Sequence, residues 1–201
     1  EGVKNDEHPV VITDSGDNPG AGGSENITYP LEKIIELEVE DTLLAVIADA
    51  EAYQKCSVVG EEAEIELDLG QRDIHEDSPA TKVKGRVKKL GNYHGVKAVV
   101  LKYNENELVI TDRQVVMTDP AFLEELDLDL SSYQLIILKS GYLDPKFRPY
   151  SARTILGLAP GYTNQVFEEL PYQNLPRPIF PLDNNFKWTA TDNFFSRIKL
   201  F

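Results

Sequence analysis

Val10-Val11-Ile12-Thr13-Asp14-Ser15-Gly16-Asp17-Asn18-Pro19-Gly20-Ala21-Gly22-Gly23-Ser24 is the stretch that decides the fold of this chain. A short β-branched run leads into a loop with four glycines, and an amphipathic run follows from Tyr29 to Val39. This order predicts a strand, a functional loop and a helix. In open α/β sheets, ligands bind at loops that leave the carboxyl ends of strands. The loop is therefore the first candidate site.

The composition of this loop supports two interpretations. Its glycines let the backbone approach a ligand closely, and Asp17 and Asn18 offer short polar groups. The same residue types are also ordinary turn formers that satisfy only their own backbone. The loop contains no lysine and its glycines lack the dinucleotide spacing, so neither a Walker loop nor a Rossmann fingerprint is present. Its acidic side chains favour a cation, a hydroxyl-rich ligand or an amide over a phosphate.

The rest of the chain predicts an α/β fold with a mixed sheet and flanking helices. Leu43 to Ala48 is a continuous apolar run typical of a buried strand, and Asp49 is placed to cap a helix that begins at Ala50. Polar and apolar residues then alternate over 63–69, 82–88 and parts of 96–103, and a turn is expected near Asn104. This middle segment predicts antiparallel β structure with one wet face.

The last third of the chain shows weaker patterns. Asp119-Pro120 predicts a helix start, and Leu135 to Leu138 predicts a short buried strand. Residues 147–158 suggest a helix or an irregular segment. The prolines beyond Ala159 predict an extended tail that wraps the surface. We expect a linker or disordered entry over 1–9, one domain over 10–183, and an aromatic tail over 184–201.

Composition narrows the partners and the compartment. The chain has 201 residues, 20 basic against 34 acidic, and a net charge of −14, which disfavours nucleic acid and anionic membrane surfaces. No apolar run approaches the ~20 residues of a membrane span. Cys56 is the only cysteine, so a reducing, cytoplasmic location is expected, with Cys56 as a small buried residue. The start at Glu1 suggests a fragment of something longer and leaves a removed leader open.

Few residues outside the loop carry recognisable chemistry. The histidines are His8, His75 and His94, and none lies at zinc-ligand spacing, so no metal site is expected in this chain. Ser15 lacks the Gly-x-Ser-x-Gly context of a nucleophile, which favours a structural hydroxyl. Lys139 ends an apolar strand and is either an ion-pair partner or part of a cleft. Arg113 is either salt-bridged to an aspartate or faces substrate.

The string from Asp14 to Gly23 resembles the hallmark of the C-terminal domain of the microcystinase C (MlrC) family of zinc metallopeptidases. Three later stretches fit the same family in the same order. They are 111–114 with 119–122, then 136–140, and finally 170–172 with 177–183. The resemblance covers nearly the whole chain.

This resemblance implies a function for the loop. In the family, an N-terminal domain that this sequence lacks binds the catalytic zinc. Asp17 and Asn18 are then expected to face an interdomain cleft in a supporting catalytic role, so that Asp17→Ala in the full-length protein lowers turnover with the fold intact. The residues expected on the substrate side are Ser15, Gly20, Gly22, Gly23, Arg113, Lys139 and Ser140. One departure is that Gly141-Tyr142 follows Lys139-Ser140 where many members carry His-Phe.

Two functional hypotheses follow. The first is the C-terminal domain of a zinc-dependent hydrolase that cleaves amide or peptide bonds in a small substrate, inactive by itself and partnered by the N-terminal domain of the same polypeptide. The alternative is a non-catalytic module for small-ligand binding or assembly. A homo-oligomer is left open, and substrate identity is not fixed by family resemblance.

Overall fold

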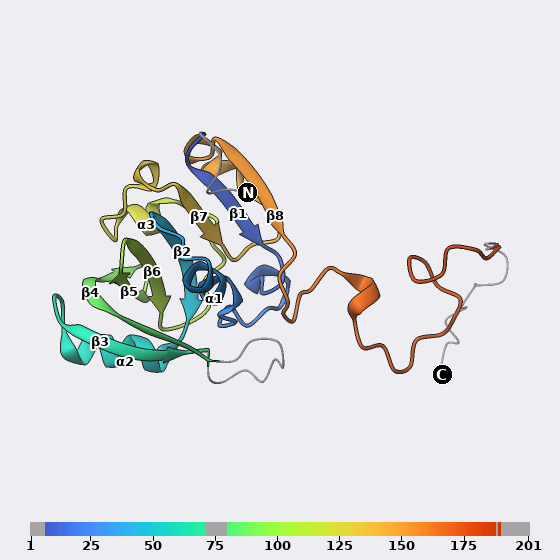
Figure 1. The fold of residues 1–201 in the computed structure, drawn as a ribbon, viewed down its shortest axis with the longest axis horizontal. Helices are drawn as coiled ribbons and strands as arrows, with labels where there is room; N and C mark the ends of the chain where they lie inside the picture. Colours follow the sequence, from blue (N-terminus) through green and yellow to red (C-terminus); the bar gives the residue numbers. More distant parts are fainter. Residues whose placement is uncertain (1–6, 71–79, 188, 190–201) are drawn as a thin grey trace, which may run out of the picture. The chain divides into compact units, whose positions relative to one another are not determined.

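A computed structural model describes residues 7–70, 80–187 and 189 of the chain (Figure 1). The chain divides into two compact units, Glu1–Gln165 and Val166–Phe201. The described part of the second unit contains one short 3-10 turn, η5 (Phe167–Glu169), between proline-rich irregular segments. The absence of longer regular structure there agrees with the effect of its prolines.

The first unit alternates strands and helices, as a mixed α/β fold requires. In chain order its elements are β1 (Val10–Asp14), η2 (Pro19–Ala21), α1 (Tyr29–Glu36), β2 (Thr42–Ala48), α2 (Ala50–Val59), β3 (Glu64–Leu69), β4 (Thr81–Tyr93), β5 (Val96–Tyr103), β6 (Asn106–Thr111), α3 (Ala121–Glu124), η3 (Leu130–Ser132), β7 (Leu135–Leu138), η4 (Pro145–Tyr150) and β8 (Arg153–Gly157).

The described strands form one mixed sheet in the order β3-β4-β5-β6-β2-β7-β1-β8. Strands β6, β2, β7, β1 and β8 run parallel to one another, whereas β3 to β6 pair antiparallel (Figure 1). The prediction of a mixed sheet with an antiparallel middle segment is therefore confirmed. Because β6 pairs with β2, the antiparallel strands and the parallel strands belong to one continuous sheet.

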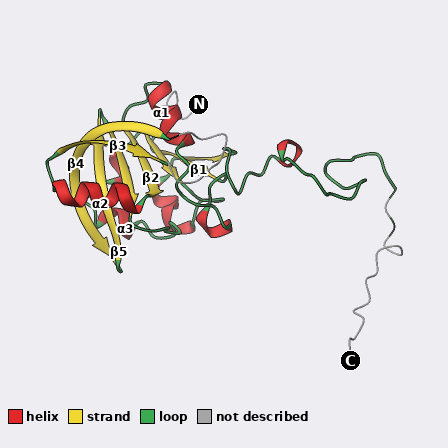
Figure 2. Cartoon of the chain, turned by 90° about the horizontal axis from the view of Figure 1, so that it is seen from below, coloured by secondary structure: helices red, strands yellow, loops and turns green. Residues whose placement is uncertain are grey.

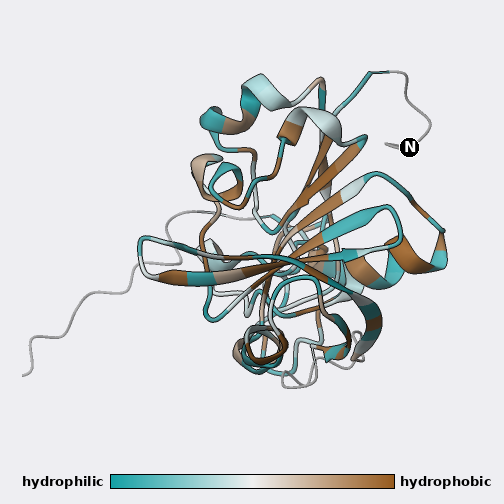
Figure 3. Cartoon of the chain, turned by 90° about the vertical axis from the view of Figure 1, so that its left-hand side faces the viewer, coloured by the Kyte–Doolittle hydropathy of each residue, from teal (hydrophilic) through white to brown (hydrophobic). Residues whose placement is uncertain are grey.

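Helices cover both faces of the sheet (Figure 2). Alternate residues of the central strands feed two separate hydrophobic clusters, as the period of two along a strand requires. One cluster joins Leu44 and Ile137 to α1 and α2, and the other joins Leu43 and Ile136 to α3. The mostly hydrophobic colouring of the central strands in Figure 3 follows from burial on both faces.

Local signals explain the helices next to the parallel strands. The Asp49 carboxylate accepts hydrogen bonds from the amides of Glu51 and Ala52, so the predicted cap of α2 is confirmed. Pro30 occupies the first turn of α1, where its missing N–H costs nothing. Cys56 is fully buried in the core on the α2 side, and burial raises the pKa of its thiol to about 11.

Two expectations about local structure are corrected, and a third is confirmed. Residues 153–157, expected to be helical or irregular, form β8, an edge strand whose exposed residues gave no apolar pattern. The prediction of one solvent-exposed face is correct for β3 and β4, but β6 is buried throughout because it lies inside the sheet. The predicted helix start at Asp119-Pro120 is confirmed, because α3 begins at Ala121 and the Asp119 carboxylate accepts a hydrogen bond from the amide of Ala121.

Some expectations concern residues outside the described ranges. They include most of the expected linker at the start, His75 with its acidic neighbours, and the aromatic residues Trp188, Phe194, Phe195 and Phe201. Among the helices in the described ranges, none has the length and apolar character needed to cross a membrane.

Candidate functional site

The candidate site forms where five parallel strands end. Since β1, β2, β6, β7 and β8 run the same way, their carboxyl ends share one edge of the sheet. We call the loop of residues 14–23 the hallmark loop. The register pairs Thr13 with Leu138 and Asp14 with Gly157, so this loop leaves the sheet beside Lys139. The separate stretches 14–23, 111–114 and 139–140 thus meet at this edge.

Asp17 and Lys139 form a fully buried ion pair at the base of the loop. The Lys139 ammonium donates to the Asp17 carboxylate at 2.7 Å and to the carbonyl of Ile27 at 2.5 Å. The same carboxylate accepts from the amides of Glu25 and Ile27, each at 2.8 Å. Burial alone would raise the pKa of Asp17, but the Lys139 charge and these hydrogen bonds bring it below its ordinary value. The pair fixes 17–27 against the end of β7.

Asp14 is the second carboxyl near this ammonium. One carboxyl oxygen accepts a hydrogen bond from the amide of Gly16 at 3.0 Å. The other, Oδ2, has no hydrogen-bond partner among the described residues and lies 4.0 Å from Lys139 Nζ. Burial raises the pKa of Asp14, and the neighbouring Lys139 only partly offsets it. Asp14 and Asp17 therefore differ in pKa direction because the ammonium bonds directly to only one of them.

Glu25 is a buried acid just after the carboxyl end of the loop. Its backbone has φ of 61°, a left-handed conformation that side chains rarely adopt. Oε2 accepts from the amide of Val115 at 2.6 Å, while Oε1 has no partner. Burial raises the pKa of Glu25 to about 9 despite that hydrogen bond. The Glu25 carbonyl accepts from the amide of Ala48, which ties the loop to the end of β2.

The segment after β8 fastens the start of the loop. Ser15 is buried, and both its amide and its hydroxyl donate to the carbonyl of Gly157 at 2.9 Å. The Thr163 hydroxyl donates to the carbonyl of Ser15 and accepts from the amide of Asn18. A side chain at Gly16 would place Cβ 1.9 Å from the carbonyl oxygen of Ala159. The geometry gives the Ser15 hydroxyl and Gly16 a packing role.

The tip of the loop, residues 18–22, is its accessible part. Asn18 and Pro19 are half-buried, and the residues from Gly20 to Gly22 are exposed. The Asn18 carboxamide oxygen accepts from the amide of Gly20 at 2.9 Å and caps the turn η2. Gly22 ends η2 at φ of 98°, a conformation suited to glycine. Its Cβ position is open, so a ligand or partner can approach the backbone there.

Gly23 differs from the glycines of the tip. It is buried, and a Cβ there would lie 2.7 Å from the backbone of Asp17 and Asn18. Its carbonyl accepts a hydrogen bond from the Gln114 side chain at 2.7 Å. In this chain the lack of a side chain at Gly23 therefore lets the end of the loop pack against the backbone of Asp17 and Asn18.

The remaining predicted residues lie around the tip. Arg113 is exposed and makes two hydrogen bonds to the Asp112 carboxylate, which agrees with the salt-bridged alternative. The Ser140 hydroxyl donates to the carbonyl of Tyr142 at 2.7 Å. Exposed Val116 and Tyr142 flank the tip, and Gly141 packs against the Asn18 side chain, where its Cβ position is 2.9 Å from Asn18 Nδ2.

The buried acids do not fit a zinc ion. Within the described residues, no group of three or more His, Cys, Asp or Glu side chains could hold a metal ion. Zinc favours imidazole and thiolate ligands, and this cluster offers carboxyl groups alone. The Lys139 ammonium already supplies the positive charge among them. We therefore derive no metal-dependent step from these residues.

Sequence reasoning missed the buried acids Asp14 and Glu25. Asp14 was assigned no role of its own, although its place at the end of a buried strand could have indicated an interior carboxyl. No pattern singled out Glu25, since its burial depends on β2 and Val115, which are distant in sequence.

Comparisons with known proteins agree with this architecture. The family model described as MlrC C-terminus matches residues 12–174. A crystal structure named as a putative metallopeptidase from Mesorhizobium sp. BNC1 superposes with a TM-score of 0.75 at 19% identity, over 94% of this chain and 40% of that one. A search among curated proteins gave no match. This chain spans less than half of the crystallised protein. By the extent of the family match, the chain belongs to the MlrC C-terminal domain family.

Proposed function

We propose that this chain is the C-terminal domain of a zinc-dependent hydrolase of amide or peptide bonds, and that the tip of the hallmark loop forms one wall of an interdomain active-site cleft. The proposal is supported by the family match over 12–174 and by the name of the crystallised neighbour. In this proposal an N-terminal domain of the same polypeptide binds the zinc, which activates water and polarises the carbonyl when bound.

The observation that carries the proposal is the contrast within the loop. Its base is fully buried around the Asp17–Lys139 pair, while its tip presents Asn18, the exposed backbone of Gly20 and open space at Gly22. A rigid base that holds an accessible tip is what a positioned binding loop requires. Exposed Val116 and Tyr142 beside the tip add apolar surface for a substrate or for the partner domain.

This geometry changes the role that we assign to Asp17. The sequence interpretation had Asp17 facing the cleft, with Asp17→Ala leaving the fold intact. The Asp17 carboxylate is 0% exposed and accepts four hydrogen bonds, from Lys139, Ser24, Glu25 and Ile27. We therefore assign Asp17 and Lys139 to positioning of the loop, and Asn18 to contact with the substrate or with a bound water.

The test is Asn18→Ala in the full-length protein. Its expected result is a fall in kcat of about tenfold or more, with zinc content and unfolding midpoint little changed. Asn92→Ala is the matched control, because the Asn92 side-chain oxygen likewise accepts a backbone hydrogen bond, from Gly95, although Asn92 is exposed and Asn18 is half-buried. Equal kinetics for Asn18→Ala and Asn92→Ala would refute the role of the tip.

Zinc content separates this function from the alternative of a non-catalytic module. Elemental analysis of the 201-residue chain and of its longer parent should find zinc in the parent alone. Zinc in the short chain would contradict our assignment of the metal to the N-terminal domain. A parent without zinc and without amidase activity would favour the binding or assembly module.

A further inference from the structure

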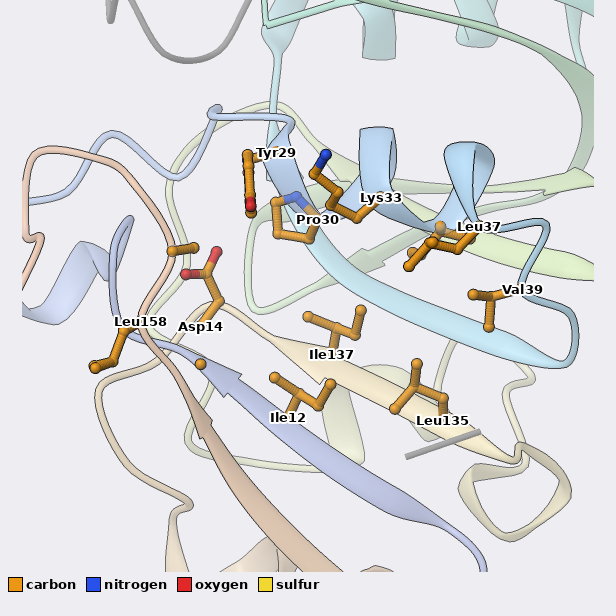
Figure 4. Close-up of a pocket in the computed structure, with 13 residues that line it drawn as sticks. Ile12, Asp14, Tyr29, Pro30, Lys33, Leu37, Val39, Leu135, Ile137 and Leu158 are labelled. Carbon is orange, nitrogen blue, oxygen red and sulfur yellow. The ribbon is translucent and has the colours of Figure 1, made fainter. Parts of the chain in front are cut away.

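A cavity of about 300 Å³ lies beneath α1, away from the tip of the hallmark loop. Its floor is made by Ile12 of β1 with Leu135 and Ile137 of β7, and α1 with the residues after it forms the opposite wall (Figure 4). No residue from 15 to 28 lines the cavity. It is therefore distinct from the proposed cleft at 18–22.

Among the described residues that line this largely apolar cavity, Asp14 alone supplies a carboxyl group. The residue is 2% exposed, and its Oδ2 atom has no hydrogen-bond partner. In Figure 4 its carboxyl group points into the space beneath Tyr29 and Pro30. A buried polar atom without a hydrogen-bond partner destabilises the fold, and a ligand that bonds to it recovers part of that cost.

We propose that this cavity binds a small neutral molecule, with an aromatic ring or branched alkyl group against Ile12 and Ile137 and one hydroxyl or carboxamide group at Asp14. The volume suits a single ring or a short branched chain. The site is independent of the proposed hydrolytic function.

The charges around Asp14 favour an uncharged ligand. The Lys139 ammonium lies 4.0 Å from Asp14 Oδ2 and would repel a cationic ligand. The Asp14 carboxyl group disfavours an anion when it is ionised, and the Lys33 ammonium, which also lines the cavity, is already paired with Glu36. A hydroxyl or carboxamide both donates and accepts, so it satisfies Asp14 in either protonation state. The raised pKa of Asp14, caused by burial, is consistent with a protonated carboxyl that donates to such a group.

The first experiment compares four probes of similar shape. Benzamide, benzylamine, benzoate and toluene are titrated into the ¹⁵N-labelled protein, and amide chemical shifts are followed by NMR. We expect saturable shifts at Ile12, Leu37 and Ile137, with benzamide binding at least about fivefold tighter than the other three. Absence of saturable shifts for all four probes overturns the site. Preference for benzylamine or benzoate overturns the neutral class, and equal binding of toluene overturns the role of Asp14.

Two variants locate the binding. Leu37→Trp places a larger side chain at the wall of the cavity, and it should weaken benzamide binding at least about fivefold. Ile35→Trp is the matched control, because Ile35 is 43% exposed, lies in the last turn of α1 and does not line the cavity. Both sites are exposed, so both variants should fold. Equal effects of the two variants would contradict binding in this cavity.

Two further variants test the polar contact. Asp14→Leu removes the carboxyl group, so it should weaken benzamide while leaving toluene binding unchanged. Asp14→Asn keeps an acceptor for the Gly16 amide and puts a donor near the Oδ2 position, so it should retain benzamide binding. Loss of benzamide binding in Asp14→Asn, with the fold intact by circular dichroism, would contradict the contact.

Discussion

The base and the tip of the hallmark loop are adjacent in sequence but differ in burial and charge. At the base, Asp17 and Lys139 are fully buried and share a short hydrogen bond. At the tip, Gly20 and Gly22 are exposed, and open space surrounds Gly22. One sequence motif thus contains residues that hold the loop in place and residues that are accessible to a ligand. Variants at the base should accordingly change mainly stability, and variants at the tip should change mainly activity.

The largest effect is expected at the base. Lys139→Met leaves the Asp17 carboxylate buried without its partner, so the free energy of unfolding should fall by about 3–5 kcal/mol. Lys146→Met is the matched control, because the Lys146–Asp119 pair is largely exposed, and it should cost at most about 1 kcal/mol. Urea unfolding of both variants measures the difference.

The double variant Lys139→Met, Asp17→Leu sharpens the same comparison. Removing both charges avoids an unpaired buried carboxylate, so it should be less destabilised than Lys139→Met alone. The amides of Glu25 and Ile27 lose their acceptor in that variant, which keeps the recovery incomplete. A Lys139→Met variant as stable as Lys146→Met would show that the base does not depend on this pair.

Glycine substitutions compare packing at the base with freedom at the tip. Gly16→Ala should destabilise the fold by about 2–3 kcal/mol, because its Cβ would overlap the backbone at Ala159. Gly20→Ala should cost less than about 1 kcal/mol, because its nearest neighbour is the Asn18 side chain at 3.2 Å. Thermal or urea unfolding checks both values. A similar loss at the two glycines would mean that the tip is as constrained as the base.

Much of the fold could be predicted because its signals are local. The buried run at 43–48, the cap at Asp49 and the alternation over 63–69 each depend on neighbouring residues. Strand β8 could not be predicted in the same way. Its residues are largely exposed at the sheet edge, and its structure depends on pairing with β1.

The candidate site could be predicted only in outline. The order of the motifs placed Lys139 at the edge of the sheet that carries the loop, because parallel strands share their carboxyl ends. Which side chains turn inward depends on contacts between distant segments. The Asp17 carboxylate meets Lys139, 122 positions away, and Glu25 meets Val115, 90 positions away. These contacts, absent from any local pattern, distinguish the buried base from the exposed tip.

Glu25 gives a pH-dependent test at the buried end of the loop. Its pKa is about 9 in the folded protein, against 4.5 ordinarily, because burial disfavours the charged form more than Lys139 and the Val115 amide favour it. Between these values the unfolded chain releases a proton that the folded chain keeps. This carboxyl therefore lowers stability progressively as pH rises from about 4.5 to about 9, and the loss levels off above that.

Glu25→Gln removes this titration while it keeps an acceptor for the Val115 amide. At pH 8 the variant should be more stable than the wild type by at least about 1 kcal/mol, and the difference should shrink toward pH 5. Urea unfolding at several pH values measures it. The Asp17 carboxylate, the other acid near Glu25, has a lowered pKa and contributes the opposite slope at acidic pH. An unchanged gap between pH 5 and pH 8 would contradict the assignment of the slope to Glu25.

The smallest effect on stability is expected at Arg113, on the exposed side of the comparison. Its guanidinium pairs with Asp112 at a largely exposed position, so Arg113→Ala should change the free energy of unfolding by less than about 0.5 kcal/mol.

The sequence nevertheless places Arg113 within a stretch that fits the family. If that position serves substrate, Arg113→Ala in the full-length protein should raise KM with little change in kcat, because the lost contact is one of binding. Arg86→Ala is the matched control, since Arg86 pairs with exposed Glu62 in the antiparallel part of the sheet. Equal KM values for the two variants would leave Arg113 as a surface ion pair and restrict the accessible wall of the cleft to the tip of the loop.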